Sequence, residues 1–494
     1  MSKTGAFFSR NSRGFSRLQT ALLTVFLTVA TAVNAQQADD DERAAQKHSD
    51  FEKEAEATRS EFNAYRDSVV QDYEKYEATL KEEFDGYVKS ISMIWGLDSA
   101  LTDSPTRWVE YGDDFLSRSV VDFDRGTVDI EVAVDEVADN SIVTQQLTDA
   151  VERMMTSRGS TCPWTSKVEQ SSPITQAPVM DGLLDFSPYH LSVDSSALSA
   201  LSSPRSGRAV APTPVRRGRN LATSQEPVAT VPTGNKHLSR EREAARKAAA
   251  NRLAANLGGK ESVDGNRNEI GGATKLQSLR ELARQVVEQS RMTVSTVRGE
   301  DNTARKIVRV EMKMVTDHLP KSAALYGDIV AKYSERFGIE QPLIFAVMEQ
   351  ESNFNPQATS WVPAYGLMQL VPTSGGADAY RYVYGKEGIP TRAFLFNPDN
   401  NICLGTAYLR VLFNQFAKVA DAECRRLCVI AGYNTGAGNV SRAFIGSANL
   451  SQAFSSINTF AYNALYNHLA TRLNTQEARE YVVGVTGRRE KYLK

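Results

Sequence analysis

Aromatic side chains recur at a fixed interval along residues 39–88, a stretch whose other positions are crowded with Asp and Glu. Two sets of rings are each spaced eleven residues apart: Phe51, Phe62, Tyr73 and Phe84, and Tyr65, Tyr76 and Tyr87. Eleven residues are close to three turns of an α-helix, so these rings fall on one nearly straight stripe. The pattern predicts one long amphipathic helix, whose stripe packs either on its own domain or on a partner.

Strand patterns follow the long helix and return much later in the chain. Residues 120–123 and 127–132 are separated by a turn signal, and the second stretch alternates apolar and polar positions as a half-buried strand does. Similar stretches at 291–297 and 306–314 flank a hairpin turn. We expect all of these strands to share one sheet, in an α+β domain that ends near Pro320.

A Ser/Pro-rich stretch at 163–235 interrupts this domain of residues 36–320, and it holds nine of the 17 prolines of the chain. Its composition predicts a flexible insertion. The Ala/Arg-rich residues 238–256 are expected to form a helix with a solvated charged face. From residue 321 to residue 494 the pattern is helical throughout, which predicts a second domain that is all-α.

The first 35 residues have the pattern of a secretion signal. Four basic residues precede an apolar run at 18–33, which ends in small residues where a signal peptidase would cut before Gln36. Four threonines interrupt the run, which is short for a membrane span, although a retained membrane anchor is the alternative. We expect an exported, periplasmic protein. The cut has no cysteine nearby, so a lipid anchor is not expected even if the protein associates with the membrane.

Composition narrows the class of protein further. The chain has 494 residues, of which 41% are hydrophobic and 23% charged, which excludes a multi-span membrane protein and a wholly disordered chain. The formal net charge of -2 gives no reason to expect a nucleic-acid partner. The five histidines show no ligand spacing, so neither a metal nor another cofactor is expected. Of the four cysteines, Cys403 could form a disulfide with Cys424 or Cys428.

One carboxyl in the second domain is a candidate for catalysis. Residues 341–352 predict a helix, and Glu351 shares a face with the apolar residues Ile344 and Val347. Burial disfavours the charged form of a carboxyl, so the pKa should rise and the group could act as a general acid. A Glu paired with a buried Arg is the alternative. Glu349 lies about 200° around the helix from Glu351, so it should face solvent, and its replacement should be nearly silent.

Four ordered motifs follow within about 90 residues of this helix. They are Glu351-Ser352, Gly366-Leu367-Met368-Gln369, Asn401-Ile402 with Tyr408-Leu409, and Tyr433-Asn434 with Gly436 and Gly438. Together they resemble the SLT domain of lytic murein transglycosylases, in the lysozyme superfamily. Residues 388–398, 478–482, 108–111 and 121–123 are similar to the membrane-bound lytic murein transglycosylase C family. The lipidated cysteine of that family is absent here, and the long insertion is not expected in it.

The resemblance implies a reaction as well as a lysozyme-like fold. Glu351 matches the family's single catalytic acid, which protonates the glycosidic oxygen between N-acetylmuramic acid and N-acetylglucosamine in peptidoglycan glycan strands. It then takes a proton from the muramic C6 hydroxyl, which closes onto C1 and leaves a 1,6-anhydro end. A glycosidase usually needs a second carboxylate about 5–10 Å away. Between Glu351 and Asp378 the sequence has no acid, which suits a reaction that consumes no water.

The resemblance also assigns six substrate-binding positions. Ser360 and Gln369 match residues that contact sugar near the cleavage point, and Val371 stands where relatives often have a longer apolar residue. Tyr433 matches a tyrosine beside the acid, and Tyr481 a late tyrosine of the cleft. Asn434 is expected to fix the local backbone at the edge of this site.

Two other functions compete with the lyase. One is a goose-type lysozyme, which shares the architecture but adds water through a distant carboxylate. The other is a non-catalytic peptidoglycan-binding scaffold of an envelope machine, in which the N-terminal domain would bind an envelope protein.

Overall fold

The structure is a computed structural model that describes residues 38–192, 268–360 and 363–493. The expected signal peptide, most of the expected insertion and the expected helix at 238–256 lie outside the described residues. The described residues within 80–386 and 390–494 belong to one compact unit, and residues 38–79 and 387–389 are the described part of another.

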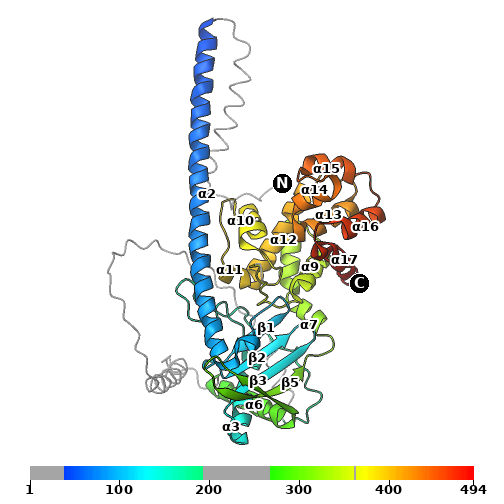
Figure 1. The fold of residues 1–494 in the computed structure, drawn as a ribbon. Coiled ribbons are helices and arrows are strands. Elements are labelled where there is room, and N and C mark those ends of the chain that lie inside the picture. The colour runs from blue at the N-terminus through cyan, green and yellow to red at the C-terminus, as the bar shows by residue number, and fades with distance from the viewer. Residues whose placement is uncertain (1–37, 193–267, 361–362, 494) are drawn as a thin grey trace, which may run out of the picture. The chain divides into compact units, whose positions relative to one another are not determined.

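The predicted long helix is α2, Ala38–Trp95, which carries the chain from the first unit into the second (Figure 1). In its first unit, Phe62 and Tyr65 of the aromatic stripe are 41% and 53% exposed. In the second unit, Tyr87, Ile91 and Trp95 are buried and pack with the sheet residues Ala133 and Ile307. The end of the stripe therefore packs on its own domain.

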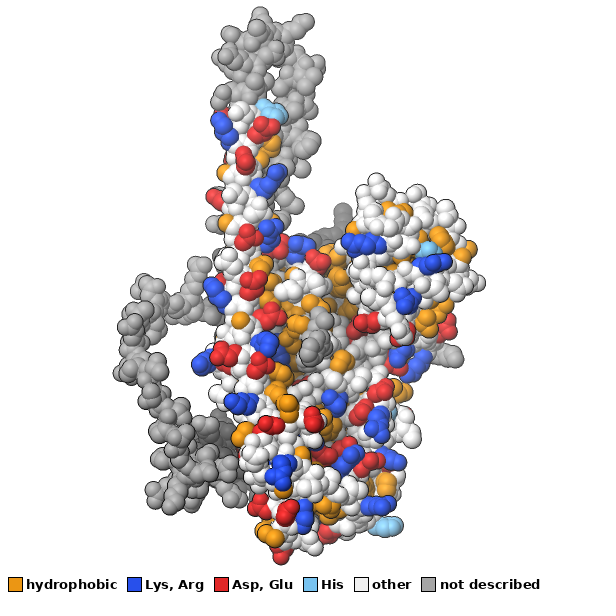
Figure 2. Space-filling view, viewed as in Figure 1, with side chains coloured by type: hydrophobic (Ala, Val, Ile, Leu, Met, Phe, Trp, Pro, Cys, Tyr) orange, Lys and Arg blue, Asp and Glu red, His pale blue; other side chains and the backbone are white. Residues whose placement is uncertain are grey.

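Acidic and basic side chains are interspersed along the exposed part of α2 (Figure 2). Several form ion pairs one turn apart, among them Lys53 with Asp50, Lys75 with Asp72, and Lys81 with Asp85. Each exposed ion pair of this kind adds little stability, but together the pairs favour the helical conformation of this solvent-exposed stretch.

The sheet has five antiparallel strands in the order β1-β2-β3-β5-β4. The strands are β1 Arg107–Tyr111, β2 Ser117–Asp122, β3 Thr127–Val134, β4 Met292–Arg298 and β5 Ala304–Lys313. Ile130 of β3 stands opposite Val310 of β5, so the late strands complete the early sheet across the insertion, as the sequence predicts.

Successive side chains of β3 point to opposite faces of the sheet, and each face is covered by different helices. Val128, Ile130 and Val132 point to a core built with α3, Asn140–Thr156, and α6, Asn268–Gln289. Ala133 points the other way, toward the end of α2. The short helix η1, Leu97–Ser99, follows α2 before the chain enters β1.

Residues 163–192 correct the prediction of a flexible insertion from position 163 onward. They form few regular elements, yet Ile174, Met180 and Leu183 are buried, and Leu184 forms a bridge to Met314 after β5. Proline content predicted flexibility because it prevents helices and strands, but it does not prevent apolar side chains from packing irregularly. The remainder of the expected insertion lies outside the described residues.

The second domain is helical, as predicted. Its helices are α7 His318–Leu325, α8 Gly327–Phe337, α9 Gln341–Ser352, α10 Ala377–Tyr384, α11 Arg392–Phe396, α12 Pro398–Gln415, α13 Ala422–Thr435, α14 Ala437–Ile445, α15 Leu450–Ile457, α16 Tyr462–Arg472 and α17 Gln476–Lys491, with a π turn, η2, at Pro372–Gly376. Helix α9 is fully covered at Leu343, Ile344 and Val347 by this bundle.

The candidate disulfide of Cys403 is absent. All four cysteines are free and buried. Burial raises the pKa of the Cys428 thiol, with a smaller contribution from Cys424, so it stays a neutral, space-filling side chain.

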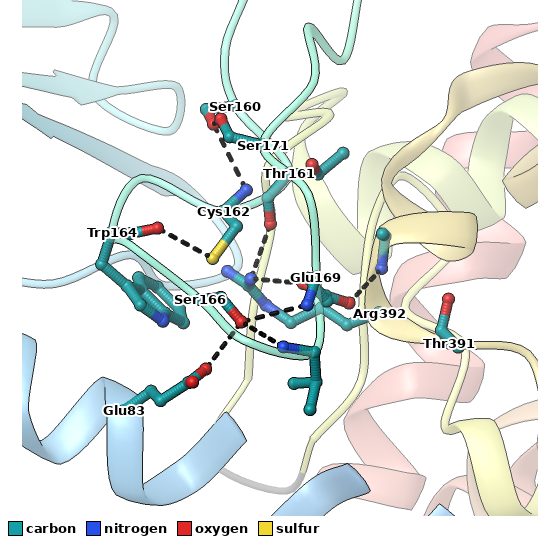
Figure 3. A network of polar contacts seen from close by, with 12 residues as sticks. Glu83, Ser160, Thr161, Cys162, Trp164, Ser166, Glu169, Ser171, Thr391 and Arg392 are labelled. Atoms are coloured by element: carbon teal, nitrogen blue, oxygen red, sulfur yellow. Dashed lines mark hydrogen bonds and ion pairs between the residues drawn. The ribbon is translucent and has the colours of Figure 1, made fainter. Parts of the chain in front are cut away.

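A loop of the first domain is fastened to the helical domain (Figure 3). Arg392, at the start of α11, donates a hydrogen bond of 2.6 Å to the carbonyl of Thr161 and pairs with Glu169 at 3.5 Å. The same Glu169 accepts a hydrogen bond of 2.9 Å from the backbone N–H of Ala393. The two side chains of the pair are only 5% and 3% exposed, so the contact lies inside the compact unit.

Candidate active site

Glu351 lies in the last turn of α9 and is partly buried. The helix starts with Pro342 in its first turn and ends at Asn353, which adopts a left-handed conformation with φ of 48°. The Glu351 Oε1 accepts a hydrogen bond of 2.7 Å from the hydroxyl of Tyr481 on α17.

The environment of this carboxyl favours the protonated form. Burial raises the pKa of Glu351 to about 8, the hydrogen bond from Tyr481 opposes that shift, and the negative charge of Glu477 adds to it. At neutral pH the group therefore holds a proton, which a general acid requires.

Buried hydrogen bonds join the motifs around Glu351. The hydroxyl of Ser352 donates to the carbonyl of Leu367 at 2.8 Å, which ties the end of α9 to the Gly-Leu-Met-Gln segment. Asn401 holds the same segment from α12, because its Oδ1 accepts from the N–H of Met368 and its Nδ2 donates to the carbonyl of Tyr365, both at 2.8 Å. Ser352 and Asn401 therefore act as positioning residues, a role that motif matching alone did not assign.

Gly366 shows why the segment needs a glycine at that point. Its φ is +75°, and an added Cβ would lie 2.5 Å from both Asn401 Nδ2 and the carbonyl oxygen of Leu395. A larger residue would push Asn401 out of place.

A cluster of tyrosines completes the surroundings of Glu351. The rings of Tyr433 and Tyr481 are stacked with centroids 6.4 Å apart, and Tyr408 is 5.3 Å from Tyr433. The Tyr433 hydroxyl donates to the carbonyl of Met368 at 2.8 Å. Burial and the nearby Glu351 raise the pKa of both Tyr433 and Tyr481, so both remain neutral donors. Tyr408 belongs to one of the recognised motifs but was not assigned to the site.

Three further candidates lie on residues 360 and 363–371, which include the Leu367 and Met368 carbonyls that Ser352 and Tyr433 bind. The amide nitrogen of Gln369 donates to the carbonyls of Ala358 and Gly366, both at 3.0 Å, and its Oε1 is buried without a hydrogen-bond partner among the described residues. The Ser360 hydroxyl accepts from the N–H of Ala364 at 3.3 Å. Val371 precedes the π turn, and its carbonyl accepts from Gly376 at 2.9 Å.

Asn434 has a different role from the one the sequence suggested. Its Nδ2 donates to Glu477 at 2.9 Å, so it links α13 to α17 rather than fixing its own backbone. This contact holds the carboxylate whose charge acts on Glu351.

The solvent-facing position expected for Glu349 is wrong. Glu349 is 7% exposed, and its oxygens lie 3.0 and 2.9 Å from Lys491 Nζ and 3.6 Å from Arg488, and accept a hydrogen bond from the Tyr492 hydroxyl. The last turn of α17 thus covers the face of α9 opposite Ile344 and Val347. Glu349 is thus a buried carboxyl with partly exposed cationic partners, since the side chains of Lys491 and Arg488 are 43% and 34% exposed.

Among the described ranges, no group of three or more His, Cys, Asp or Glu side chains could hold a metal ion. None of the helices there is long and apolar enough to cross a membrane.

Comparison with known proteins identifies two regions of the chain. Residues 328–455 match the family model described as Transglycosylase SLT domain, which covers α9 and Glu351. These residues form a transglycosylase SLT domain. Residues 73–154 match a second model, described as Membrane-bound lytic murein transglycosylase C, N-terminal domain. The resemblance stated from the sequence and the predicted fold class are both confirmed.

Curated relatives are similar to this chain over part of their length. The Membrane-bound lytic murein transglycosylase C of Haemophilus ducreyi is 42% identical over 190 residues, 38% of this chain and 51% of that protein. The protein of the same name from Klebsiella pneumoniae is 40% identical over 197 residues, 40% of this chain and 54% of the relative. The chain therefore spans about half the length of the curated relatives it matches. A solved structure, the 70 kDa soluble lytic transglycosylase SLT70 from Escherichia coli, is 27% identical over 36% of this chain and 25% of that one, with a TM-score of 0.28.

Proposed function

We propose that this protein is a peptidoglycan lytic transglycosylase that cleaves the β-1,4 bond between N-acetylmuramic acid and N-acetylglucosamine. The observation that carries the proposal is the protonated carboxyl of Glu351, held by Tyr481 inside an SLT domain. The curated relatives are named for the same activity.

In the first half of the reaction, the Glu351 proton passes to the glycosidic oxygen as the bond to C1 breaks. The Tyr481 hydroxyl stabilises the carboxylate that this leaves. In the second half, the carboxylate takes the proton of the muramic C6 hydroxyl while that oxygen bonds to C1. The proton returns to Glu351, a 1,6-anhydro end is formed, and no water is consumed.

Gln369 and Ser360 are proposed to bind the sugars on either side of the bond. The unpartnered Oε1 of Gln369 is suited to accept a hydrogen bond from the N–H of an acetamido group, which would remove the cost of burying that oxygen unpaired. Val371, Tyr433 and Asn434 would shape the cleft around them.

One observation favours a hydrolase as the second candidate. The carboxylate of Glu477 acts electrostatically on Glu351, and a lysozyme needs a second carboxylate to activate water. Asn434 donates a hydrogen bond to one oxygen of Glu477, and the other oxygen is the candidate for such a role.

Mass spectrometry of the products from purified peptidoglycan separates these functions. We expect wild type to give anhydro-muramic ends, with fragment masses that sum to the parent, and Glu351→Gln to give no product because an amide cannot donate and retake the proton. Glu477→Gln is the matched control and should keep its products. Fragments heavier by one water per cut, lost in Glu477→Gln, would show a hydrolase. No cleavage by wild type would favour a binding scaffold.

We further propose that the protein acts in the periplasm, in remodelling or turnover of the cell wall, after removal of residues 1–35. The mature N-terminus should then be Gln36, which the intact mass of protein purified from the envelope fraction would test. An uncut N-terminus would favour the retained anchor instead.

A further inference from the structure

A cavity of about 460 Å³ lies in the first domain, apart from the SLT site. Three segments enclose it: one face of α2, the turn between β1 and β2, and the loop at 163–165. Its main lining residues are Glu83, Gly86, Tyr87, Asp113, Phe115 and Trp164.

The cavity is acidic. Its charged lining residues are the two carboxylates Glu83 and Asp113, and no Lys, Arg or His lines it. Glu83 accepts hydrogen bonds from the Ser166 hydroxyl at 2.6 Å and the N–H of Lys167 at 2.8 Å, so its carboxylate is held in place at the wall. These bonds, from Ser166 first, lower the pKa of Glu83 and keep it charged. A carboxylate would be repelled from this wall, and an ammonium group attracted to it.

Four aromatic residues also line the cavity, beside smaller residues such as Ser90 and Thr165. The ring centroid of Tyr87 lies 5.3 Å from that of Trp164, 5.7 Å from that of Phe115 and 6.3 Å from that of Tyr111. The faces of such rings attract ammonium groups, and the attraction is largest for Trp. Aromatic faces combined with carboxylates suit an organic cation better than a neutral sugar.

Gly86 keeps one side of this cavity open. It lies inside α2, where a glycine weakens a helix relative to alanine. No close neighbour requires it, because an added Cβ would meet nothing within 4 Å. The missing side chain therefore leaves free space at the cavity wall.

Trp164 connects the cavity to the catalytic domain. The guanidinium of Arg392 lies 4.7 Å from the Trp164 ring, and Arg392 also fastens the loop through Thr161 and Glu169. Figure 3 shows this loop between Glu83 on α2 and Arg392 on α11.

We propose that this cavity binds a primary ammonium group, supplied by the free side-chain amine of an uncross-linked peptide stem of peptidoglycan. The source of the amine rests on the proposed function, since a murein enzyme meets such stems beside the glycan it cuts. The cavity would then favour glycan whose stems are not yet cross-linked.

Calorimetric titration of the full chain with a sugar-free tetrapeptide stem, acetylated at its N-terminus so that the side-chain amine is its one ammonium group, tests the proposal, because this probe lacks the glycan that the SLT site would bind. We expect binding, weakened about tenfold or more when the side-chain amine of the peptide is acetylated, since acetylation removes the charge. Gly86→Leu should abolish binding by filling the cavity, and Asp113→Asn should weaken it severalfold. Ala78→Leu, an exposed position on the same helix outside the cavity, is the matched control and should bind as wild type does.

Equal binding of the free and acetylated peptides, full affinity in Gly86→Leu, or no binding at millimolar peptide would each overturn the proposal. Cleavage of peptide-free glycan, measured in parallel, reports on the proposed lyase by itself. Cleavage without peptide binding would reject only the ammonium site, and binding without cleavage would reject only the lyase.

Discussion

The buried carboxyl of Glu351 makes the wild-type protein less stable as pH rises, and Glu351→Gln should remove that loss. The pKa of the folded protein's Glu351 is raised to about 8 from an ordinary value of 4.5. Below pH 4.5 both folded and unfolded chains hold this proton. Between the two values only the folded chain holds it, so unfolding releases a proton and stability falls with pH.

The size of the effect follows from the shift. Each pH unit in this window costs about 1.4 kcal/mol, so the loss is about 3 kcal/mol at pH 7 and about 5 kcal/mol above pH 8. A neutral amide of the same shape does not titrate. The difference in free energy of unfolding between Glu351→Gln and wild type should therefore change by about 3 kcal/mol, in favour of the variant, between pH 4 and pH 7. For a domain of this size that is a rise in Tm of about 6–12 °C.

Thermal unfolding of both proteins from pH 4 to pH 9 measures this difference. Glu335→Gln, which removes an exposed carboxyl from α8, controls for the loss of one charge, and its difference from wild type should stay nearly flat. The reasoning is refuted if the Glu351→Gln difference is independent of pH, or if the variant loses stability relative to wild type as pH rises.

Three further changes have expected outcomes. Tyr481→Phe removes a hydrogen bond to the Glu351 carboxylate worth about 1.5–3 kcal/mol, so the pH at which the cleavage rate falls on the alkaline side should rise by about 1–2 units. Tyr433→Phe, whose hydroxyl bonds the carbonyl of Met368 instead, should leave that pH unchanged. An unchanged pH profile in Tyr481→Phe contradicts the assignment of Tyr481. Glu349→Gln should lower the free energy of unfolding by about 1–3 kcal/mol in denaturant titrations, because Lys491 and the Tyr492 hydroxyl lose the buried carboxylate that they bind. An unchanged free energy of unfolding would instead indicate that the Glu349 side chain faces solvent. Arg392→Ala removes the cation from the buried ion pair with Glu169 and should cost about 3–5 kcal/mol in the same assay, with a loss under about 1 kcal/mol counting against the fastening.

Local periodicity predicted the elements well because secondary structure follows from short-range patterns. The long helix, the strands on both sides of the insertion and the helical second domain are all found. That the late strands join the early sheet was also predictable, since unpaired strands of one domain need partners, but the register that sets Ile130 opposite Val310 was not. Composition was a poorer guide at 163–192, where isolated apolar residues among prolines fill the space beside the sheet.

Positions that depend on remote segments were not predictable in this way. A helical wheel showed that Glu349 and Ile344 lie on different faces of α9, but not that the end of α17 covers the second face. In the same way, the spacing of Cys403 and Cys428 allowed a bridge that the packing of their helices does not form. Asn434 was expected to fix its local backbone, and its hydrogen bond to Glu477 could not be predicted from the motif because Glu477 lies on another helix.

The sequence by itself determined the chemistry available to this protein: an isolated carboxyl on an apolar helix face, followed by ordered motifs that identify an SLT domain. Only the tertiary structure decided the state of that carboxyl. Tyr481 is 130 residues from Glu351 in the chain yet lies 2.7 Å from it, and the surrounding bundle supplies the burial that raises its pKa. A pKa is set by desolvation and by charges and hydrogen bonds within a few ångströms, and distant parts of the chain come that close only when the protein folds.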